Sequence, residues 1–348
     1  MEYRKLGSSS IEVSVIGLGT MTWGEQNSEQ EAFEQMDYAR SQGVNLIDVA
    51  EIYPVPPRPE TSGRTEIYVG NWIADRGCRN EIVLATKVAS RSENLEASRH
   101  IRGGPRLNRD QIRRAIEGSL KRLRTDHIDL YQVHWPERPA NFFGKLNYEH
   151  IACKDLVPIS ETLDALAELV DEGLVKHIGI SNETPWGLHE YLRLSREKSL
   201  PRLVSIQNAY NLLTRAYEVG LAEMGLRESV GLLAYSPLAF GVLTGKYLGN
   251  EMPENSRLTL WSRFSRYSSE LATSATQAYS ELAYKHSMSF AQMSLAFICQ
   301  QPFVASCLVG ATTMEQLKEN ISCSDLRLST DILKEISEIN AIYPSPAA

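Results

Sequence analysis

HIDLYQVHW (residues 127–135) and VKHIGISN (residues 175–182), with the segment from Ser160 to Gly173 between them, form the stretch that decides the fold. Both quoted runs are short, rich in Val, Ile and Leu, and mostly without polar alternation, as is typical of strands covered on both faces. The segment between them has the pattern of a helix that ends at its glycine. A strand, a helix and a second strand in this order predict a βαβ unit in a parallel sheet.

The same alternation continues on both sides of this unit. Six more strand-like runs are VSVIGLG (13–19), VNLIDVA (44–50), EIVLATKV (81–88), LVSIQNAY (203–210), VGLLAYSP (230–237) and VASCLVG (304–310). Helix start signals lie between the runs, because Ser28 with Glu31 and Ser289 with Gln292 have the spacing of a capping box. Thr184 is followed by a proline at the first helical position. Eight strand–helix units predict a (β/α)8 TIM barrel.

An open, doubly wound sheet that binds a dinucleotide is the competing arrangement. Such a sheet shows G-x-G-x-x-G after its first strand, but here Gly17-Leu18-Gly19 is followed by Thr20-Met21-Thr22, without the third glycine. We therefore expect one α/β barrel domain over residues 1–348, preceded by a β-hairpin in YRKLGSSSIEVS (3–14). Long loops follow three strands, over residues 91–110, 136–158 and 238–269. We place these loops at the C-terminal rim, where barrel enzymes have their active sites.

Composition limits the kinds of partner. The formal net charge is −7 and the pI is about 5.6, so the chain has no bulk attraction for nucleic acid or anionic lipid. No apolar stretch is long enough to span a bilayer, and the N-terminus lacks the apolar core of a signal peptide. The five cysteines are Cys78, Cys153, Cys299, Cys307 and Cys323, and they are widely spaced. We expect reduced thiols in a soluble cytoplasmic protein, with the oligomeric state open.

Four residues at or just after strand ends make a coherent proton-transfer set. Asp48 ends the second predicted strand, Tyr53 follows it, Lys87 ends the third and His134 the fourth. A tyrosine hydroxyl is a poor acid at neutral pH, and a nearby ammonium favours the phenolate and lowers the pKa. An aspartate would keep that ammonium in position, and a histidine would offer a second donor to a developing oxyanion. The set fits protonation of a carbonyl oxygen.

Two other chemistries fit the sequence badly. A metal-dependent barrel hydrolase needs several ligands, but these strand ends offer one His, one Asp and no suitably spaced Cys or second His. A Ser-His-Asp hydrolase of the α/β type needs a G-x-S-x-G turn, which occurs nowhere in the chain. We therefore predict neither a metal site nor a nucleophilic serine.

Phosphate-binding signals lie in the C-terminal third. Residues 310–315 turn from the last strand into a helix, with Thr312 and Glu315 at capping-box spacing. A helix N-terminus attracts phosphate through its free N–H groups and its dipole, although an ordinary N-cap has the same pattern. Lys246 and Arg257, in the loop after the seventh strand, are candidate counter-charges, unless Arg257 is a solvated loop residue. Tyr235 could stack on a nicotinamide or belong to the core.

The ordered motifs resemble the aldo-keto reductase superfamily. They are NLIDVAEIY (45–53), ATKV (85–88), LYQVHWP (130–136), IGISN (178–182), YSPLAFGVLTGKY (235–247) and LVGATTMEQLKEN (308–320). The likeness covers nearly the whole chain, and residues 21–61 resemble the bacterial Tas-type branch. The resemblance implies an NADP(H)-dependent reductase of small-molecule aldehydes or ketones, with Tyr53 as general acid and Asp48, Lys87 and His134 completing a tetrad.

The resemblance also implies an extended cofactor across the rim. Thr20 and Met21 would lie near the nicotinamide, Ser181, Asn182 and Gln207 would bind its carboxamide, and Tyr235 would stack on the ring. Ser236, Pro237, Leu238 and Lys246 would line the pyrophosphate, with Ala239, Gly241, Leu243, Thr244 and Gly310 also at the cofactor. Arg257 and Thr312 would hold the 2′-phosphate, and Gln316, Glu319 and Asn320 the adenine.

An alternative function stays open at this point. Potassium-channel β subunits share the fold and cofactor, so the chain could be a redox-sensing regulatory subunit. Those relatives commonly lack a histidine at the position of His134, and its presence favours catalysis. The rim loops leave the substrate undefined. Their aromatic residues Trp23, Trp135, Phe142, Phe143, Trp261 and Phe264 suggest an apolar pocket or ordinary packing.

Overall fold

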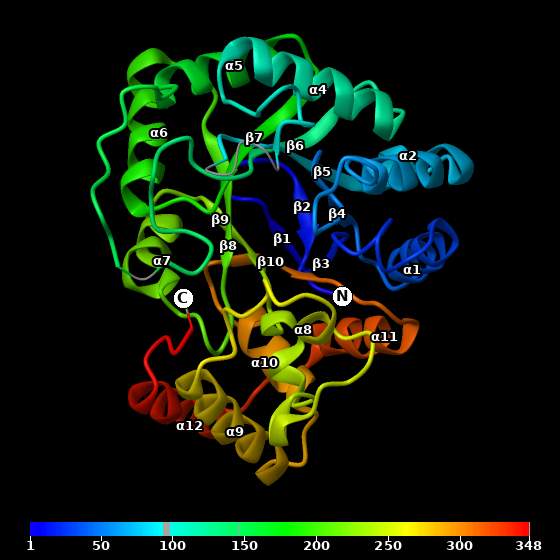
Figure 1. The fold of residues 1–348 in the computed structure, drawn as a ribbon, viewed down its shortest axis with the longest axis vertical. Coiled ribbons are helices and arrows are strands. Elements are labelled where there is room, and N and C mark those ends of the chain that lie inside the picture. The colour runs from blue at the N-terminus through cyan, green and yellow to red at the C-terminus, as the bar shows by residue number, and fades with distance from the viewer. Residues whose placement is uncertain (93–97, 146, 348) are drawn as a thin grey trace.

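A computed structural model describes residues 1–92, 98–145 and 147–347. Eight parallel strands close into a barrel in the order β10-β3-β4-β5-β6-β7-β8-β9 (Figure 1). The strands are β3 (Ile16–Gly19), β4 (Leu46–Asp48), β5 (Val83–Val88), β6 (Ile128–Val133), β7 (Val175–Ser181), β8 (Leu203–Ala209), β9 (Gly231–Tyr235) and β10 (Val304–Val309). The predicted TIM barrel is confirmed, and all eight strand-like runs contain its strands.

Helices cover the outside of the barrel (Figure 1). Those that follow successive strands are α1 (Glu29–Ser41), α2 (Arg64–Arg76), α4 (Arg109–Leu123), α5 (Ile159–Asp171), α6 (Pro185–Lys198), α7 (Tyr217–Arg227), α10 (Phe290–Cys299) and α11 (Met314–Ser322). The others are α8 (Arg257–Leu260), α9 (Glu270–Lys285), α12 (Thr330–Ile342) and the short 3₁₀ turns η1 (Arg79–Glu81), η2 (Ala239–Thr244), η3 (Leu248–Asn250) and η4 (Cys323–Asp325). Their apolar faces pack on the strands and form the main core.

Helix starts follow the predicted caps, with one difference. Ser28 and Glu31 form a complete capping box, and Thr184 caps α6 with proline at the first helical position. Ser289 accepts the backbone N–H of Gln292, as expected. The Gln292 side chain, however, donates its Nε2 to the Ser322 hydroxyl (2.9 Å) and does not accept the Ser289 backbone N–H, so this capping box is only half formed. The neighbouring α11 competes for that side chain.

The predicted N-terminal hairpin closes the bottom of the barrel. Its strands β1 (Tyr3–Lys5) and β2 (Glu12–Ser14) pair antiparallel. Leu6 and Val13, from this hairpin, are fully buried against the barrel's inward-facing apolar side chains Leu46, Ala85, Leu130, Val204, Leu233, Ala305 and Leu308. Gly7 has a φ of +56°, and a Cβ there would lie 2.1 Å from the Val204 carbonyl oxygen. Only glycine fits this turn against the start of β8.

The loops at the opposite end are fastened to the barrel by buried carboxylates. Glu51, after β4, pairs with Arg102 of the loop between β5 and α4. Glu137, after β6, pairs with Arg106 of the same loop at 2.5 Å. The loop over 238–269 was expected to be structureless, but it contains η2, η3 and α8. Part of the predicted 91–110 loop, residues 93–97, lies outside the described residues.

The remaining bulk predictions concern membranes and thiols. Among the described helices, none is both long and apolar enough to cross a membrane. All five cysteines are unpaired thiols, four of them buried and Cys153 partly buried. The chain therefore carries no disulfide between these residues, as their spacing predicted.

Candidate active site

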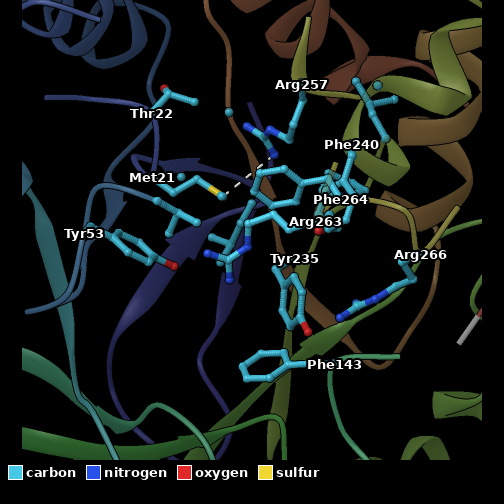
Figure 2. A pocket seen from close by; sticks show the side chains of 18 of the residues that line it. Met21, Thr22, Tyr53, Phe143, Tyr235, Phe240, Arg257, Arg263, Phe264 and Arg266 are labelled. Atoms are coloured by element: carbon cyan, nitrogen blue, oxygen red, sulfur yellow. Dashed lines mark hydrogen bonds between the residues drawn. The ribbon is translucent and has the colours of Figure 1, made fainter. Parts of the chain in front are cut away.

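A large cavity opens at the C-terminal ends of the barrel strands. Its volume is about 1480 Å³, and Figure 2 shows charged and aromatic side chains pointing into it. The predicted site residues on its wall are Thr20, Met21, Asp48, Tyr53, His134, Ser181, Asn182, Gln207, Tyr235, Ser236, Pro237, Leu238, Gly241, Thr244, Lys246, Arg257, Gly310, Thr312, Gln316, Glu319 and Asn320. Ala239 and Leu243 are buried in the hydrophobic core instead, and Lys87 lies beneath the wall.

Strand register brings the charged pair together beneath the cavity. Asp48 on β4 and Lys87 on β5 lie two residues apart along the paired strands, since Asp48 is opposite Ala85. The Lys87 ammonium donates to Asp48 Oδ2 (2.5 Å) and to the Val49 carbonyl oxygen (2.8 Å). Burial alone disfavours the ammonium, but Asp48 and Tyr53 outweigh it and raise the pKa of Lys87. Lys87 is therefore a fixed positive charge at neutral pH.

Two amides complete the surroundings of the aspartate. Gln132 Nε2 and Gln207 Nε2 donate to Asp48 Oδ1, at 3.1 Å and 2.8 Å. Gln207 Nε2 also lies 3.1 Å from Gln132 Oε1. The buried carboxylate thus has partners on both oxygens, which offsets the cost of removing it from water. The sequence reasoning missed Gln132, although it faces inward two residues before His134 and strand periodicity could have found it.

Tyr53 lies directly over the ammonium. The Lys87 Nζ is 4.9 Å from the centroid of the Tyr53 ring. Burial raises the pKa of Tyr53 above its ordinary value, and the charge of Lys87 opposes the rise without cancelling it. Lys87 lowers the pKa of Tyr53 as predicted, but desolvation of the phenolate is the larger effect, because the one ammonium is shared with Asp48. The hydroxyl is therefore protonated at neutral pH.

His134 completes the predicted set beside the tyrosine. Its ring centroid is 5.7 Å from that of Tyr53, in an edge-on arrangement. Burial, and then the nearby charge of Lys87, hold the pKa of His134 well below its usual range, so the imidazole is neutral at physiological pH. Within the described part of the chain, His134 Nδ1 is buried without a hydrogen-bond partner. A neutral imidazole can still donate one hydrogen bond to a ligand.

A hydrogen-bonded row of side chains continues from His134 along the rim. Asn182 Nδ2 donates to the His134 carbonyl oxygen (2.8 Å), and the Tyr235 hydroxyl donates to Asn182 Oδ1 (2.6 Å). Ser181 Oγ donates to the Gln207 carbonyl oxygen (2.7 Å). Burial raises the pKa of Tyr235 to about 12. Tyr235 is a partly buried residue that lines the cavity and also packs against the apolar interior of the barrel, so both of its predicted positions are partly met.

Arg257 is directed into the cavity and is not a solvated loop residue. Its Nη1 lies 3.8 Å from Met21 Sδ, and its guanidinium packs on the rings of Phe240 and Phe264 at 5.7 Å and 5.5 Å (Figure 2). No carboxylate among the described residues pairs with it, and burial lowers the pKa of Arg257. Lys246 likewise lines the cavity and contacts the Tyr247 ring. These cations fit an anionic ligand such as a phosphate.

Comparison with known proteins identifies the family of this chain. The family described as "Aldo/keto reductase family" matches residues 15–341. The chain is 54% identical to "Protein tas" of Escherichia coli (strain K12) over 347 residues, which covers 100% of both chains. It is also 40% identical to "Aldo-keto reductase" of Babesia bovis over 76% of this chain and 96% of that one. The chain belongs to the aldo/keto reductase family. It is therefore an oxidoreductase of a family that uses nicotinamide cofactors.

In this aldo/keto reductase, the last βα turn differs from the predicted cap. Thr313 and not Thr312 is the N-cap of α11, and its hydroxyl accepts the Gln316 backbone N–H at 3.3 Å. Thr312 instead donates its backbone N–H and hydroxyl to Gln316 Oε1, at 3.1 Å and 3.2 Å. The prediction was wrong by one residue, because two adjacent threonines offer the same capping chemistry. Thr312 still lines the cavity.

The reductase's rim also contains residues that the sequence reasoning did not select. Arg263 and Arg266, between α8 and α9, line the cavity. Of the six aromatics considered, Trp135, Phe142, Phe143 and Phe264 line the cavity, whereas Trp23 is fully buried and Trp261 is not on the wall. The rim thus combines apolar rings with an excess of positive charge. Its sequence signal was weak, because loop arginines are usually solvated.

Proposed function

We propose that this aldo/keto reductase reduces aldehydes or ketones to alcohols with NADPH, with Tyr53 as the general acid. The observation that carries the proposal is the buried Asp48–Lys87 pair directly beneath Tyr53, with a neutral His134 at its side. When bound, the cofactor supplies hydride to the carbonyl carbon. The chain's own residues then have to supply a proton to the carbonyl oxygen.

Each member of the set has one task in this proposal. Tyr53, protonated at neutral pH, donates its hydroxyl proton to the carbonyl oxygen as negative charge develops there. Lys87 stabilises the phenolate that remains, and Asp48 keeps the ammonium charged and in place. His134 stays neutral and donates a hydrogen bond that orients the same oxygen. At neutral pH, Tyr53, Lys87 and His134 are therefore already in the protonation states that the reaction needs.

The choice of NADPH over NADH rests on electrostatics. The two cofactors differ by a 2′-phosphate, whose charge an acidic protein must balance locally. Arg257 and Lys246 are cations on the cavity wall without a carboxylate partner in the described chain, so they fit phosphate groups. Thr312 lies on the cavity wall just before α11, and Gln316, Glu319 and Asn320 would surround the adenine. We take the whole chain as one cytoplasmic barrel domain, consistent with its five free thiols.

The alternative of a redox-sensing regulatory subunit has less support. A subunit that only binds cofactor needs the cradle around Arg257 but has no use for a proton donor and an orienting imidazole. The hydrogen-bonded support of Asp48 and the buried position of His134 are features of a working acid. We therefore assign catalysis as the main function.

The test is the variant Tyr53→Phe. Loss of the hydroxyl should lower carbonyl reduction roughly a hundred- to ten-thousandfold, the usual contribution of a general acid. Turnover is followed through the absorbance of NADPH with a panel of aldehydes, and NADPH affinity through quenching of intrinsic fluorescence. Tyr284→Phe, at an exposed position of α9, is the matched control. Near-normal kcat in Tyr53→Phe, or equal losses in both variants, would contradict the assigned role.

A further inference from the structure

Four cations from one stretch of the rim lack acidic partners. Lys246, Arg257, Arg263 and Arg266 all line the cavity, and none forms an ion pair with a carboxylate in the part of the chain that the structure describes. Arg102, Arg106 and Arg138, by contrast, each pair with a buried carboxylate. Because a cation partly removed from water is costly without a partner, Lys246, Arg257 and Arg266 suit this part of the cavity to anions, and the more exposed Arg263 adds to the same charge.

The cofactor accounts for only part of this charge. Lys246 and Arg257 lie toward the turn at η2 and Met21, where the proposed phosphate positions are. Arg266 extends in a different direction. Figure 2 shows its guanidinium beside the Tyr235 hydroxyl, on the side of the rim residue Phe143, whereas Arg257 reaches Met21. The two arginines therefore serve different regions of the same cavity.

Arg266 is held in place by aromatic residues. Its guanidinium packs on the rings of Phe240 and Tyr267, at 5.8 Å and 5.9 Å, and interacts with the hydroxyls of Tyr235 and Tyr267. These groups are neutral, so they position the guanidinium and leave its charge unbalanced. Tyr235 in turn bonds to Asn182, which bonds to the backbone of His134. Arg266 thus lies at the end of a fixed row that begins at the reacting centre.

Arg263 adds a second guanidinium from the same segment. It lies three residues before Arg266, packs on the Phe264 ring at 5.7 Å, and in Figure 2 extends into the cavity between Tyr53 and Tyr235. Its side chain is more exposed than that of Arg266 and is therefore able to move toward a ligand. Two arginines that approach one space from the same loop can together bind a planar carboxylate or a phosphate.

We propose that Arg266, assisted by Arg263, binds an anionic group on the substrate, so that this reductase prefers carbonyl compounds carrying a carboxylate or a phosphate. The inference rests on the proposed function and specifies its substrate class. The rings of Trp135 and Phe143, which contact each other and also line the cavity, supply apolar contact for the body of such a substrate. Arg266 is thus a specificity-determining residue, and the proton donor remains Tyr53.

The experiment compares three aldehydes that share one ring: 4-carboxybenzaldehyde, 4-formylphenyl phosphate and the neutral methyl 4-formylbenzoate. The ratio of kcat/KM for each anionic aldehyde to that for the neutral one is measured in the wild type and in Arg266→Met. We expect the ratio to fall roughly ten- to hundredfold in the variant, the effect of losing a hydrogen bond to a charged group. If the ratio falls more for the carboxylate than for the phosphate, the site prefers a carboxylate, and the reverse result indicates a phosphate. Intrinsic aldehyde reactivity cancels, because each ratio is compared between proteins.

Three controls separate this role from others. Arg227→Met removes an exposed arginine of α7 and should leave the ratio unchanged. Arg266→Lys keeps the charge without the guanidinium fork, should restore part of the preference, and replaces the methionine variant if that one fails to fold. NADPH affinity is titrated in each protein by fluorescence quenching. The preference in the wild type should also weaken as salt is added.

Two results would overturn the inference: an unchanged ratio in Arg266→Met, or a loss of NADPH affinity as large as the loss in kcat/KM. The second would assign Arg266 to the cofactor. Binding of 4-carboxybenzaldehyde and of its methyl ester in the presence of NADP⁺, measured by calorimetry, separates this proposal from the proposed function. If the anionic compound binds more tightly than its ester, and Arg266→Met loses this difference, the anion site is supported. If no aldehyde is turned over at the same time, the reductase function is refuted but the anion site is not. Equal binding of both compounds would refute the anion site alone.

Discussion

The two ends of the barrel differ in what the same strands carry. At the N-terminal end, inward-facing Leu46, Ala85 and Leu130 pack against the hairpin. Two residues further along the same strands, Asp48, Lys87 and Gln132 face the floor of the cavity. On each strand, consecutive inward-facing residues, two apart in the sequence, therefore change from apolar to polar. They form an apolar layer near the hairpin and a polar layer under the cavity. Stability and chemistry occupy separate layers, so they can be altered separately.

The polar layer is stable because its members satisfy one another. Lys87 neutralises Asp48, and the amides of Gln132 and Gln207 bond its second oxygen. The apolar layer below excludes water from this network and keeps the effective dielectric constant low. The same burial raises the pKa of Tyr53 and lowers that of His134. The chemistry of the rim therefore depends on the closed bottom without using any of its residues directly.

The largest expected effect separates the two layers by stability. Leu6→Ala removes a fully buried side chain from the hairpin and leaves a cavity under the barrel. Truncations of this kind cost about 2–5 kcal/mol of stability. We expect a lower urea midpoint but a nearly normal kcat while the protein remains folded. Lys5→Ala, an exposed neighbour, is the control, and a large fall in kcat without loss of stability would show that the layers are coupled.

The sequence predicted the apolar layer well for a physical reason. Strands buried on both faces leave long apolar runs, and helices between them leave caps and glycines, so each unit is recognisable without its neighbours. The same local patterns gave Asp48, Tyr53, Lys87 and His134 as strand-end residues, and register brings them together. The hairpin was recognisable from its turn, with Gly7 at a positive φ.

The rest depended on contacts between distant segments. The direction of the Tyr53 pKa is decided by how completely the surrounding loops remove water, which no local pattern reports. Strand periodicity places Gln132 on the inward face, but its bond to Asp48, 84 residues away, is visible only in the structure. Arg266 has no sequence signal that separates it from a solvated arginine. Only the structure shows that it packs on aromatic rings and that no carboxylate of the described residues pairs with it.

A smaller effect should distinguish the parts of the rim. Arg257→Ala removes a guanidinium that we assign to the 2′-phosphate, so NADPH binding should weaken by about 2 kcal/mol, as for a lost hydrogen bond to a charged group. NADH binding should hardly change, because it has no phosphate at that position. Both affinities are titrated by quenching of intrinsic fluorescence. Equal weakening of the two cofactors would mean that Arg257 acts on the shared pyrophosphate or on the fold of the loop.

The smallest effect tests whether the rim contributes to stability through pH. Because burial depresses the pKa of His134 in the folded protein, the unfolded chain binds a proton at this residue near pH 6.5, where the folded protein does not. The stability from a neutral His134 is therefore complete above pH 6.5 and is lost as the pH falls toward the folded pKa. Between pH 6.5 and 5.5 the loss should be about 1 kcal/mol.

His134→Gln cannot take up this proton, so its urea midpoint should fall less than that of the wild type over this range. His189→Gln, at an exposed position of α6, should behave like the wild type. Parallel curves for wild type and His134→Gln would show that folding does not depress the pKa of His134, and the inferred effect of its burial would fail.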